Sequence, residues 1–380
     1  MAKVRILFFI LMVVVVGILG YFVSMYARGY RWSNKTFQFS PSGLFVVNSD
    51  PKGAQIYING ALRTAADATI DLPPGNYDVS IKKDGFLPWS KSLTIQKEVV
   101  TQIDIFLFPV AGSLSPITFS GATSPVASSD FSKIAYSNSE GLWVTETFNL
   151  PIGFSREPRQ VTDGDLTGAA WQFSPDGRQI LLTTKTGTFL IDTGKFTPQG
   201  ERINIAGKTK ETLDDWQIKK GQVLKAQFQR LPESLRDIFN RKATDIVFSP
   251  DENKVLYTAS ESASIPSNLI KELPGSSTQK QEREIKKGNK YVYDIKEDRN
   301  FKVAEPDQVA YWFPTSAHLI LPQKDKIVIE DYDGTNGVTV YSGSYTAPYA
   351  YPFSNTSRII ILTNLGSNGG APNLYSLSLR

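Results

Sequence analysis

The chain has 380 residues, of which 41% are hydrophobic and 21% charged, so it is too long for one small domain and too apolar for a disordered protein. It carries 41 basic and 37 acidic residues, but five of the basic residues lie within the first 35 positions and the remaining body is nearly neutral. Without a basic excess we expect no nucleic-acid binding. The absence of cysteine excludes disulfides and thiolate metal sites, and with a single histidine, His318, we expect neither a metal nor a cofactor.

The N-terminal region contains 22 consecutive uncharged residues, at positions 6–27. About 20 apolar residues are enough to cross a bilayer as a helix, whereas the apolar region of a cleavable signal peptide has roughly 7–15. We therefore predict an uncleaved single-pass anchor in the cell membrane, preceded by a tail at 1–5 and followed by a linker at 28–42. Basic residues flank the run on both sides, so the positive-inside rule alone does not decide the orientation.

Residues 43–109 alternate apolar and polar side chains in the manner of half-buried strands. Turn signals separate the alternating runs: Asn59 with Gly60 suits a two-residue hairpin, and a Pro-Pro-Gly-Asn segment precedes the strand around Val79. No helical period occurs in this stretch. The pattern predicts a small all-β sandwich of about seven short strands.

Two segments of this sandwich, SDPKGAQIYING and LPPGNYDVSIKKDGF, resemble the PEGA domain. The four residues that give that family its name are here Pro51, Lys52, Gly53 and Ala54, with lysine in place of glutamate. The resemblance implies a non-enzymatic wall or surface contact module that faces outward. On this basis we favour a cytoplasmic N-terminus and an extracytoplasmic body.

The rest of the chain, residues 110–380, repeats one pattern five times: SSDFSKIAY, FSPDGRQILL, FSPDENKVLY, WFPTSAHLIL and PFSNTSRIII. The basic spacing is near 40 residues, the size of a four-stranded propeller blade. Four repeats are followed by a candidate fourth strand, which in the second repeat lies around Phe196 and Thr197. The fifth repeat lacks one, and the segment SLSPITF at 113–119 is predicted to supply it and close the ring.

The Ser-Pro-Asp turns at 174–176 and 249–251 resemble those of WD40-like and TolB-like β-propeller repeats. This resemblance implies an all-β propeller. TolB-like propellers commonly have six blades, whereas five repeats are counted here.

Two insertions interrupt the repeats, at 203–243 and 261–288. One precedes the first strand of the third repeat and the other follows its second strand, so both are expected on the same face of the propeller. Together the stretches 201–243 and 280–290 carry an excess of seven positive charges. The candidate partner-binding residues are Trp216, Lys219, Lys220, Arg283, Lys286 and Lys287.

The first insertion also has an apolar stripe at helical spacing, formed by Leu224, Phe228, Leu231, Leu235 and Phe239. Pro232 followed by Glu233 fits a helix start. The stripe favours simple packing on the propeller, with solvated charges opposite it. A partner-binding surface is the alternative.

Catalytic patterns are weak in this sequence. No Gly-x-Ser-x-Gly motif occurs, and the DYDGTNG segment, with Asp331, Asp333 and Asn336, fits a hairpin turn better than a calcium loop. His318 is expected to be structural. One alternative from another class is a propeller glycoside hydrolase acting on envelope or extracellular polysaccharide, which would use the aspartates that precede or begin inner strands, Asp165, Asp245 and Asp307.

The sequence therefore predicts a membrane-anchored, extracytoplasmic and non-catalytic binding or scaffold protein of the cell envelope. Its expected partners are the lipid bilayer, through the N-terminal helix, and an envelope protein or a cell-wall or surface polymer.

Overall fold

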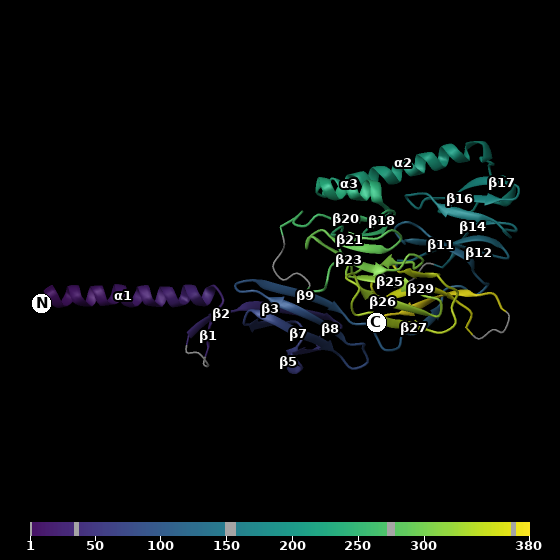
Figure 1. Cartoon of the computed structure of the whole chain (residues 1–380). Helices are drawn as coiled ribbons and strands as arrows, with labels where there is room; N and C mark the ends of the chain where they lie inside the picture. Colours follow the sequence, from purple (N-terminus) through teal and green to yellow (C-terminus); the bar gives the residue numbers. More distant parts are fainter. Residues whose placement is uncertain (1, 34–37, 149–156, 272–277, 366–369) are drawn as a thin grey trace. The chain divides into compact units, whose positions relative to one another are not determined.

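The computed structural model describes residues 2–33, 38–148, 157–271, 278–365 and 370–380. The chain divides into two compact units, residues 1–107 with 272–279 and residues 108–271 with 280–380. Each unit is described separately below, and both are dominated by small β-sheets (Figure 1).

The first unit begins with the apolar helix α1, Ala2–Ala27. Within it, residues 4–27 are long and apolar enough to cross a membrane, a property that a membrane anchor shares with a signal sequence. The predicted linker contains a hairpin of β1, Tyr30–Ser33, and β2, Gln38–Pro41.

A sandwich of seven strands follows the hairpin, as the alternation predicted. One sheet has the order β6-β3-β9 and the other the order β5-β4-β7-β8. The strands are β3, Gly43–Asp50; β4, Gln55–Ile58; β5, Ala61–Ala65; β6, Ala68–Leu72; β7, Gly75–Lys82; β8, Trp89–Ile95; and β9, Val100–Phe106. Every second side chain of β3 is buried, and Phe45, Ile56 and Ile81 are among the fully buried residues of a core confined to this sandwich. Asn59 and Gly60 both adopt positive φ in the tight turn between β4 and β5, which explains this dipeptide there.

The second unit contains five antiparallel sheets of three or four strands within its described residues. The first sheet comprises β11, Thr123–Ala127; β12, Lys133–Asn138; β13, Gly141–Glu146; and β14, Arg159–Asp163. The second comprises β15, Ala170–Phe173; β16, Gln179–Thr184; and β17, Gly187–Asp192. The third comprises β18, Ala243–Phe248; β19, Lys254–Ala259; β22, Lys290–Asp294; and β23, Arg299–Ala304. The fourth comprises β24, Tyr311–Trp312; β25, His318–Pro322; β26, Lys326–Asp331; and β27, Val338–Ser342.

The fifth sheet joins the two ends of the second unit. It has the order β10-β30-β29-β28, with β28 at Ala350–Pro352, β29 at Arg358–Thr363 and β30 at Asn373–Ser378. Its outer strand is β10, Leu114–Pro116, which pairs antiparallel with β30 so that Leu114 lies opposite Leu377. The predicted pairing of the 113–119 segment with the C-terminal strand is confirmed.

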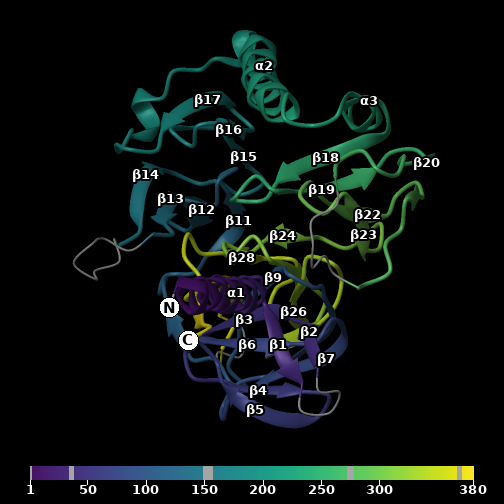
Figure 2. The same cartoon turned by 90° about the vertical axis from the view of Figure 1, so that its left-hand side faces the viewer.

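Buried side chains link neighbouring sheets. One apolar cluster joins the first and second sheets, another joins the first and fifth, and a third joins the third and fourth. The fourth and fifth sheets contact each other through β24, β25 and β28. Figure 2 shows β11, β15, β18, β24 and β28, each the edge strand that begins its repeat, gathered toward the middle of the unit.

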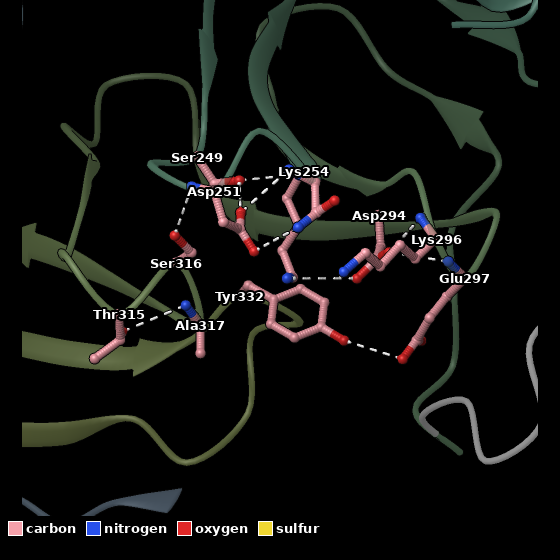
Figure 3. A network of polar contacts seen from close by, with 11 residues as sticks. Ser249, Asp251, Lys254, Asp294, Lys296, Glu297, Thr315, Ser316, Ala317 and Tyr332 are labelled. Carbon is pink, nitrogen blue, oxygen red and sulfur yellow. Dashed lines mark hydrogen bonds and ion pairs between the residues drawn. The ribbon is translucent and has the colours of Figure 1, made fainter. Parts of the chain in front are cut away.

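The repeated Ser-x-Asp turn between the first two strands closes on itself through hydrogen bonds. The Ser249 hydroxyl donates to Asp251 Oδ1 at 2.6 Å and accepts the Lys254 N–H at 3.0 Å, as Figure 3 shows. Burial alone would raise the pKa of Asp251, but the hydrogen bonds from Ser249 and Asn253 hold it below its ordinary value. The same serine-to-aspartate bond, also 2.6 Å long, occurs in the first and second repeats. This local bonding explains why the pattern recurs in the sequence.

One turn also connects two sheets. The Asp251 N–H donates to Ser316 Oγ at 3.0 Å, which joins the third sheet to the turn of the fourth (Figure 3). Nearby, Lys254 lies 3.8 Å from an oxygen of Asp294 and 4.6 Å from the centre of the Tyr332 ring.

The prediction of a fourth strand in the second sheet, around Phe196 and Thr197, is wrong. The Thr197 N–H donates to the carbonyl of Val161, in β14 of the first sheet, at 2.8 Å. The outer position beside β17 is occupied instead by Asn204, which forms an isolated bridge with Phe189. Polar contacts hold the segment after β17 toward the first sheet, including one from Arg202 Nε to Thr162 Oγ1 at 2.8 Å. The prediction rested on apolar alternation, which does not reveal such polar contacts.

A short 3-10 turn, η1 at Gln199–Glu201, precedes the first insertion. The insertion itself forms a second 3-10 turn, η2 at Ala206–Lys208, and two helices, α2 at Thr209–Phe228 and α3 at Glu233–Lys242. The second contains a two-stranded hairpin of β20, Ala263–Ser264, and β21, Glu284–Ile285. Ala243 pairs with Ala259, so both insertions leave the third sheet at the same end, as expected.

Candidate partner-binding surface and central cavity

The predicted apolar stripe of the first insertion packs on the third sheet. Phe228, Leu235 and Phe239 are buried in one cluster with Tyr257 and Tyr293 of that sheet. The cluster also contains Ile265 and Ile285 of the second insertion, but, among the residues that the structure describes, no side chain of the second sheet. One face of the third sheet therefore packs against α2 and α3, whereas its other face packs against the fourth sheet.

The middle of α2 is the exception to this packing. All residues from 217 to 223 are exposed, over two turns of helix, between the buried Trp216 and the buried Phe228. Ile218 and Val223 are 58% and 61% exposed. In Figures 1 and 2, α2 extends from beside β17 to α3, so the exposed span bridges the second and third sheets.

The exposed span is basic. Lys219 and Lys220 are exposed on it, Lys225 is exposed just after it, and no acidic residue occurs between Trp216 and Leu231. Lys225 lies in the last turn of α2, where the helix dipole favours positive charge. The span thus combines ammonium groups with two exposed aliphatic side chains.

The structure separates the six candidate residues into exposed and buried ones. Lys219 and Lys220 are exposed on α2, and Lys286 and Lys287 are exposed on the second insertion, just after β21. Trp216 is 6% exposed, so its ring offers almost no surface to a partner.

Arg283 is also removed from the candidate surface. Its guanidinium lies 3.2 Å from Asp298 Oδ1, in an ion pair whose carboxylate side chain is 1% exposed. The same Asp298 oxygen accepts the Tyr293 hydroxyl at 2.5 Å, and the other carboxylate oxygen accepts the Leu269 N–H at 2.8 Å. Arg283 therefore neutralises a buried carboxylate that anchors the second insertion.

A cavity of about 350 Å³ lies among the first, third and fourth sheets. Two of the three aspartates considered for glycosidase chemistry, Asp245 and Asp307, line it, and the third, Asp165, is not among its lining residues. Its walls include the aromatic residues Phe131, Tyr311 and Trp312. Asp245 has φ +51° and lies at an irregularity in the β18–β19 pairing, a feature that changes side-chain direction along a strand.

The DYDGTNG turn and His318 both have internal partners. The hydroxyl of Thr335 donates to Asp333 Oδ1 at 2.6 Å, and Asn336 Nδ2 donates to Asp331 Oδ2 at 2.9 Å. His318 is buried, with Nδ1 2.7 Å from Thr315 Oγ1 and Nε2 3.5 Å from Asp331 Oδ1. Within the described ranges there is no group of three or more His, Asp or Glu residues placed to hold a metal ion.

Comparison with known proteins identifies one family. The PEGA domain family matches residues 42–110, and no curated protein matches the chain. Among solved structures, TolB from Acinetobacter baumannii is similar at 14% identity over 86% of this chain and 64% of that one, with a TM-score of 0.23. The β-propeller domain of Cps50 (Swd1) from Myceliophteria thermophila is similar at 10% identity over 70% of this chain and 73% of that one, with a TM-score of 0.19. Residues 42–110 are therefore a PEGA domain, within a mostly β chain whose distant structural neighbours include TolB and propeller proteins.

Proposed function

We propose that this chain is a membrane-anchored, non-catalytic binding protein of the cell envelope, with α1 as an uncleaved anchor and the body outside the cytoplasm. The length and composition of α1 support anchoring, and the PEGA domain at 42–110 supports a surface-facing body. The five sheets of the second unit serve as the blades of one propeller, closed by β10 and bridged between the second and third blades by α2 and α3.

The exposed span of α2 is the single observation that carries the binding function. A helix that is free on all sides over two turns obtains no tertiary packing there, although packing is what stabilises most helices in proteins. Ile218 and Val223 lie exposed beside the lysines, and contact with a partner would bury them. The partner that fits this chemistry is an acidic envelope protein with an apolar contact surface, because an anionic polysaccharide offers less apolar area to these two side chains.

The test is site-specific photo-crosslinking in intact cells with the full chain. A photoreactive amino acid replaces Val223, and the same amino acid replaces the exposed Leu62 of the PEGA domain as a positional control. We expect a crosslinked acidic protein from position 223 that is lost in the double variant Lys219→Glu, Lys220→Glu and retained in Lys219→Arg, Lys220→Arg. Loss with glutamate and retention with arginine would show that charge is recognised.

Two outcomes would contradict the proposal. Equal crosslinking by the glutamate and arginine variants would make the charges irrelevant, and labelling of a polysaccharide instead of a protein would replace the partner class. Point variants are used because a deletion of residues 203–243 would also remove Phe228, Leu235 and Phe239 from the core of the third sheet.

A further inference from the structure

We propose that the cavity among the first, third and fourth sheets binds a cationic group, an ammonium or guanidinium on a short apolar arm. Its volume of about 350 Å³ lies at the lower end of the range for small-ligand sites, roughly 300–1,000 Å³. A single basic side chain, or a small free amine, fits such a space.

Two carboxylates are among the polar groups that the cavity leaves available. Within the described part of the chain, the carboxylates of Asp245 and Asp307 accept no hydrogen bond and form no ion pair, and both residues are exposed. Lys290, the cation of the lining, donates to Thr258 Oγ1 at 3.1 Å and makes no ion pair with either aspartate. Two ionised carboxylates against one ammonium repel an anion and attract a donor-rich cation.

The aromatic walls favour the same ligand. The Phe131 and Tyr311 rings meet edge to face with centroids 5.3 Å apart. The indole N–H of Trp312 is used by the Val247 carbonyl at 3.0 Å, and the Tyr257 hydroxyl donates to Asn300 at 2.8 Å. Trp312 and Tyr257 are only 4% and 0% exposed, so the partly exposed rings of Phe131 and Tyr311 are the aromatic contribution, and ring faces attract cations.

The test is isothermal titration calorimetry on the full chain in detergent. The probes are n-butylguanidinium, its neutral counterpart n-butylurea, an acetyl-Gly-Arg-Gly-amide peptide, its citrulline analogue, and maltotriose. We expect the two guanidinium probes to bind and the three neutral probes not to bind. Tighter binding of the peptide than of n-butylguanidinium would indicate that the natural ligand is an arginine of a protein chain, and the reverse order would indicate a small free cation.

Variants localise the site. We expect Asp245→Asn and Asp307→Asn each to weaken guanidinium binding about 10-fold, the size of a lost hydrogen bond to a charged group. Asp165→Asn is the matched control, because it removes a similar charge near the start of the second sheet but does not line this cavity. An unchanged thermal unfolding midpoint in each variant would show that folding is intact.

Three results would overturn the inference: equal binding of n-butylguanidinium and n-butylurea, unchanged affinity in both cavity variants, or binding of maltotriose alone, which would return the cavity to the glycosidase alternative. The Lys219→Glu, Lys220→Glu variant should keep full guanidinium affinity, so failure of the α2 proposal and failure of this one are distinguishable.

Discussion

Glu330, in β26 of the fourth sheet, has its carboxyl group in a partly buried position. Its Oε1 atom is buried and has no hydrogen-bond partner among the described residues. Burial raises the pKa of Glu330 to about 8, and the neighbouring carboxylates of Asp331 and Asp333 contribute to the rise. Glu330 therefore remains protonated in the folded protein at a pH where an exposed glutamate is ionised.

The sign of the resulting pH dependence follows from linkage. The unfolded chain has an ordinary glutamate pKa, about 4.3, so between that value and about 8 the folded state binds more protons than the unfolded state. The contribution of Glu330 to the free energy of unfolding is therefore fully present below about pH 4.3. It falls as the pH rises toward 8, by at most about 1.4 kcal/mol per pH unit. We expect Glu330→Gln to flatten the fall of the unfolding midpoint between pH 5 and pH 8.

The control for this prediction is Glu140→Gln, at an exposed turn after β12. It should leave the wild-type pH profile unchanged, and a Glu330→Gln profile as steep as that of the wild type would refute the role of this carboxyl. Asp130, Asp176 and Asp251 have lowered pKa values, so their contribution is lost only as the pH falls through those values. They do not disturb the window from pH 5 to pH 8.

Residue types predict burial less well than they predict strands. Trp216 and Arg283 were expected at a partner surface because aromatic and guanidinium groups are common in interfaces. Arg283 is instead fixed by Asp298, a residue 15 positions away whose burial is set by the tertiary fold. The glycosidase alternative grouped Asp245 and Asp307 with Asp165, and the structure brings only the first two into one cavity.

At the scale of elements, the apolar spacing correctly predicted helices where α2 ends and where α3 lies, since both bury that stripe. The sequence could not show that residues 217–223 are free of the body. Exposure on every side depends on the distance between the second and third sheets, which no local pattern records. The missing fourth strand of the second sheet likewise depends on tertiary contacts, because polar contacts to β14 compete with β17 for the segment that follows β17.

Gly221 provides a test of this free span. It lies in the middle of α2, and a Cβ added there would meet nothing within 4 Å. A glycine inside a helix costs about 0.5–1 kcal/mol relative to alanine. We expect Gly221→Ala to slow amide hydrogen exchange across 214–226 severalfold, through the local stability of α2.

Global unfolding should change little in Gly221→Ala, because the span contributes no side chain to the core cluster that anchors α2 and α3. Phe239→Ala is the opposite case. Phe239 is fully buried against Tyr257, with ring centroids 4.9 Å apart, and its truncation should cost about 3–5 kcal/mol of global stability. Equal exchange rates in Gly221→Ala and the wild type would mean that the helix is stabilised there by contacts that the structure lacks.

At the scale of the whole second unit, the repeat pattern predicted the sheets and the pairing that joins the two ends of the unit. The prediction succeeded because each sheet is built from local hairpins, and an unpaired edge at the fifth repeat requires a strand from elsewhere. The bridge of α2 and α3 between the second and third sheets was not predicted, since it replaces a sheet-to-sheet contact by a helix-to-sheet one.

The pairing of β10 with β30 can be tested by a covalent link. Ser115 lies directly opposite Ser376, and paired residues on antiparallel strands have Cα atoms about 4.5–5.5 Å apart, a separation that suits a disulfide. The natural chain has no cysteine, so the double variant Ser115→Cys, Ser376→Cys can form only one intramolecular bond. Because the link closes a very long loop, we expect the oxidised protein to be more stable than its reduced form by about 2–4 kcal/mol, measured by denaturant unfolding with and without reductant. The single variants should show no effect of reductant, and a double variant that stays reduced under oxidising conditions would show that these two strands are not neighbours in solution.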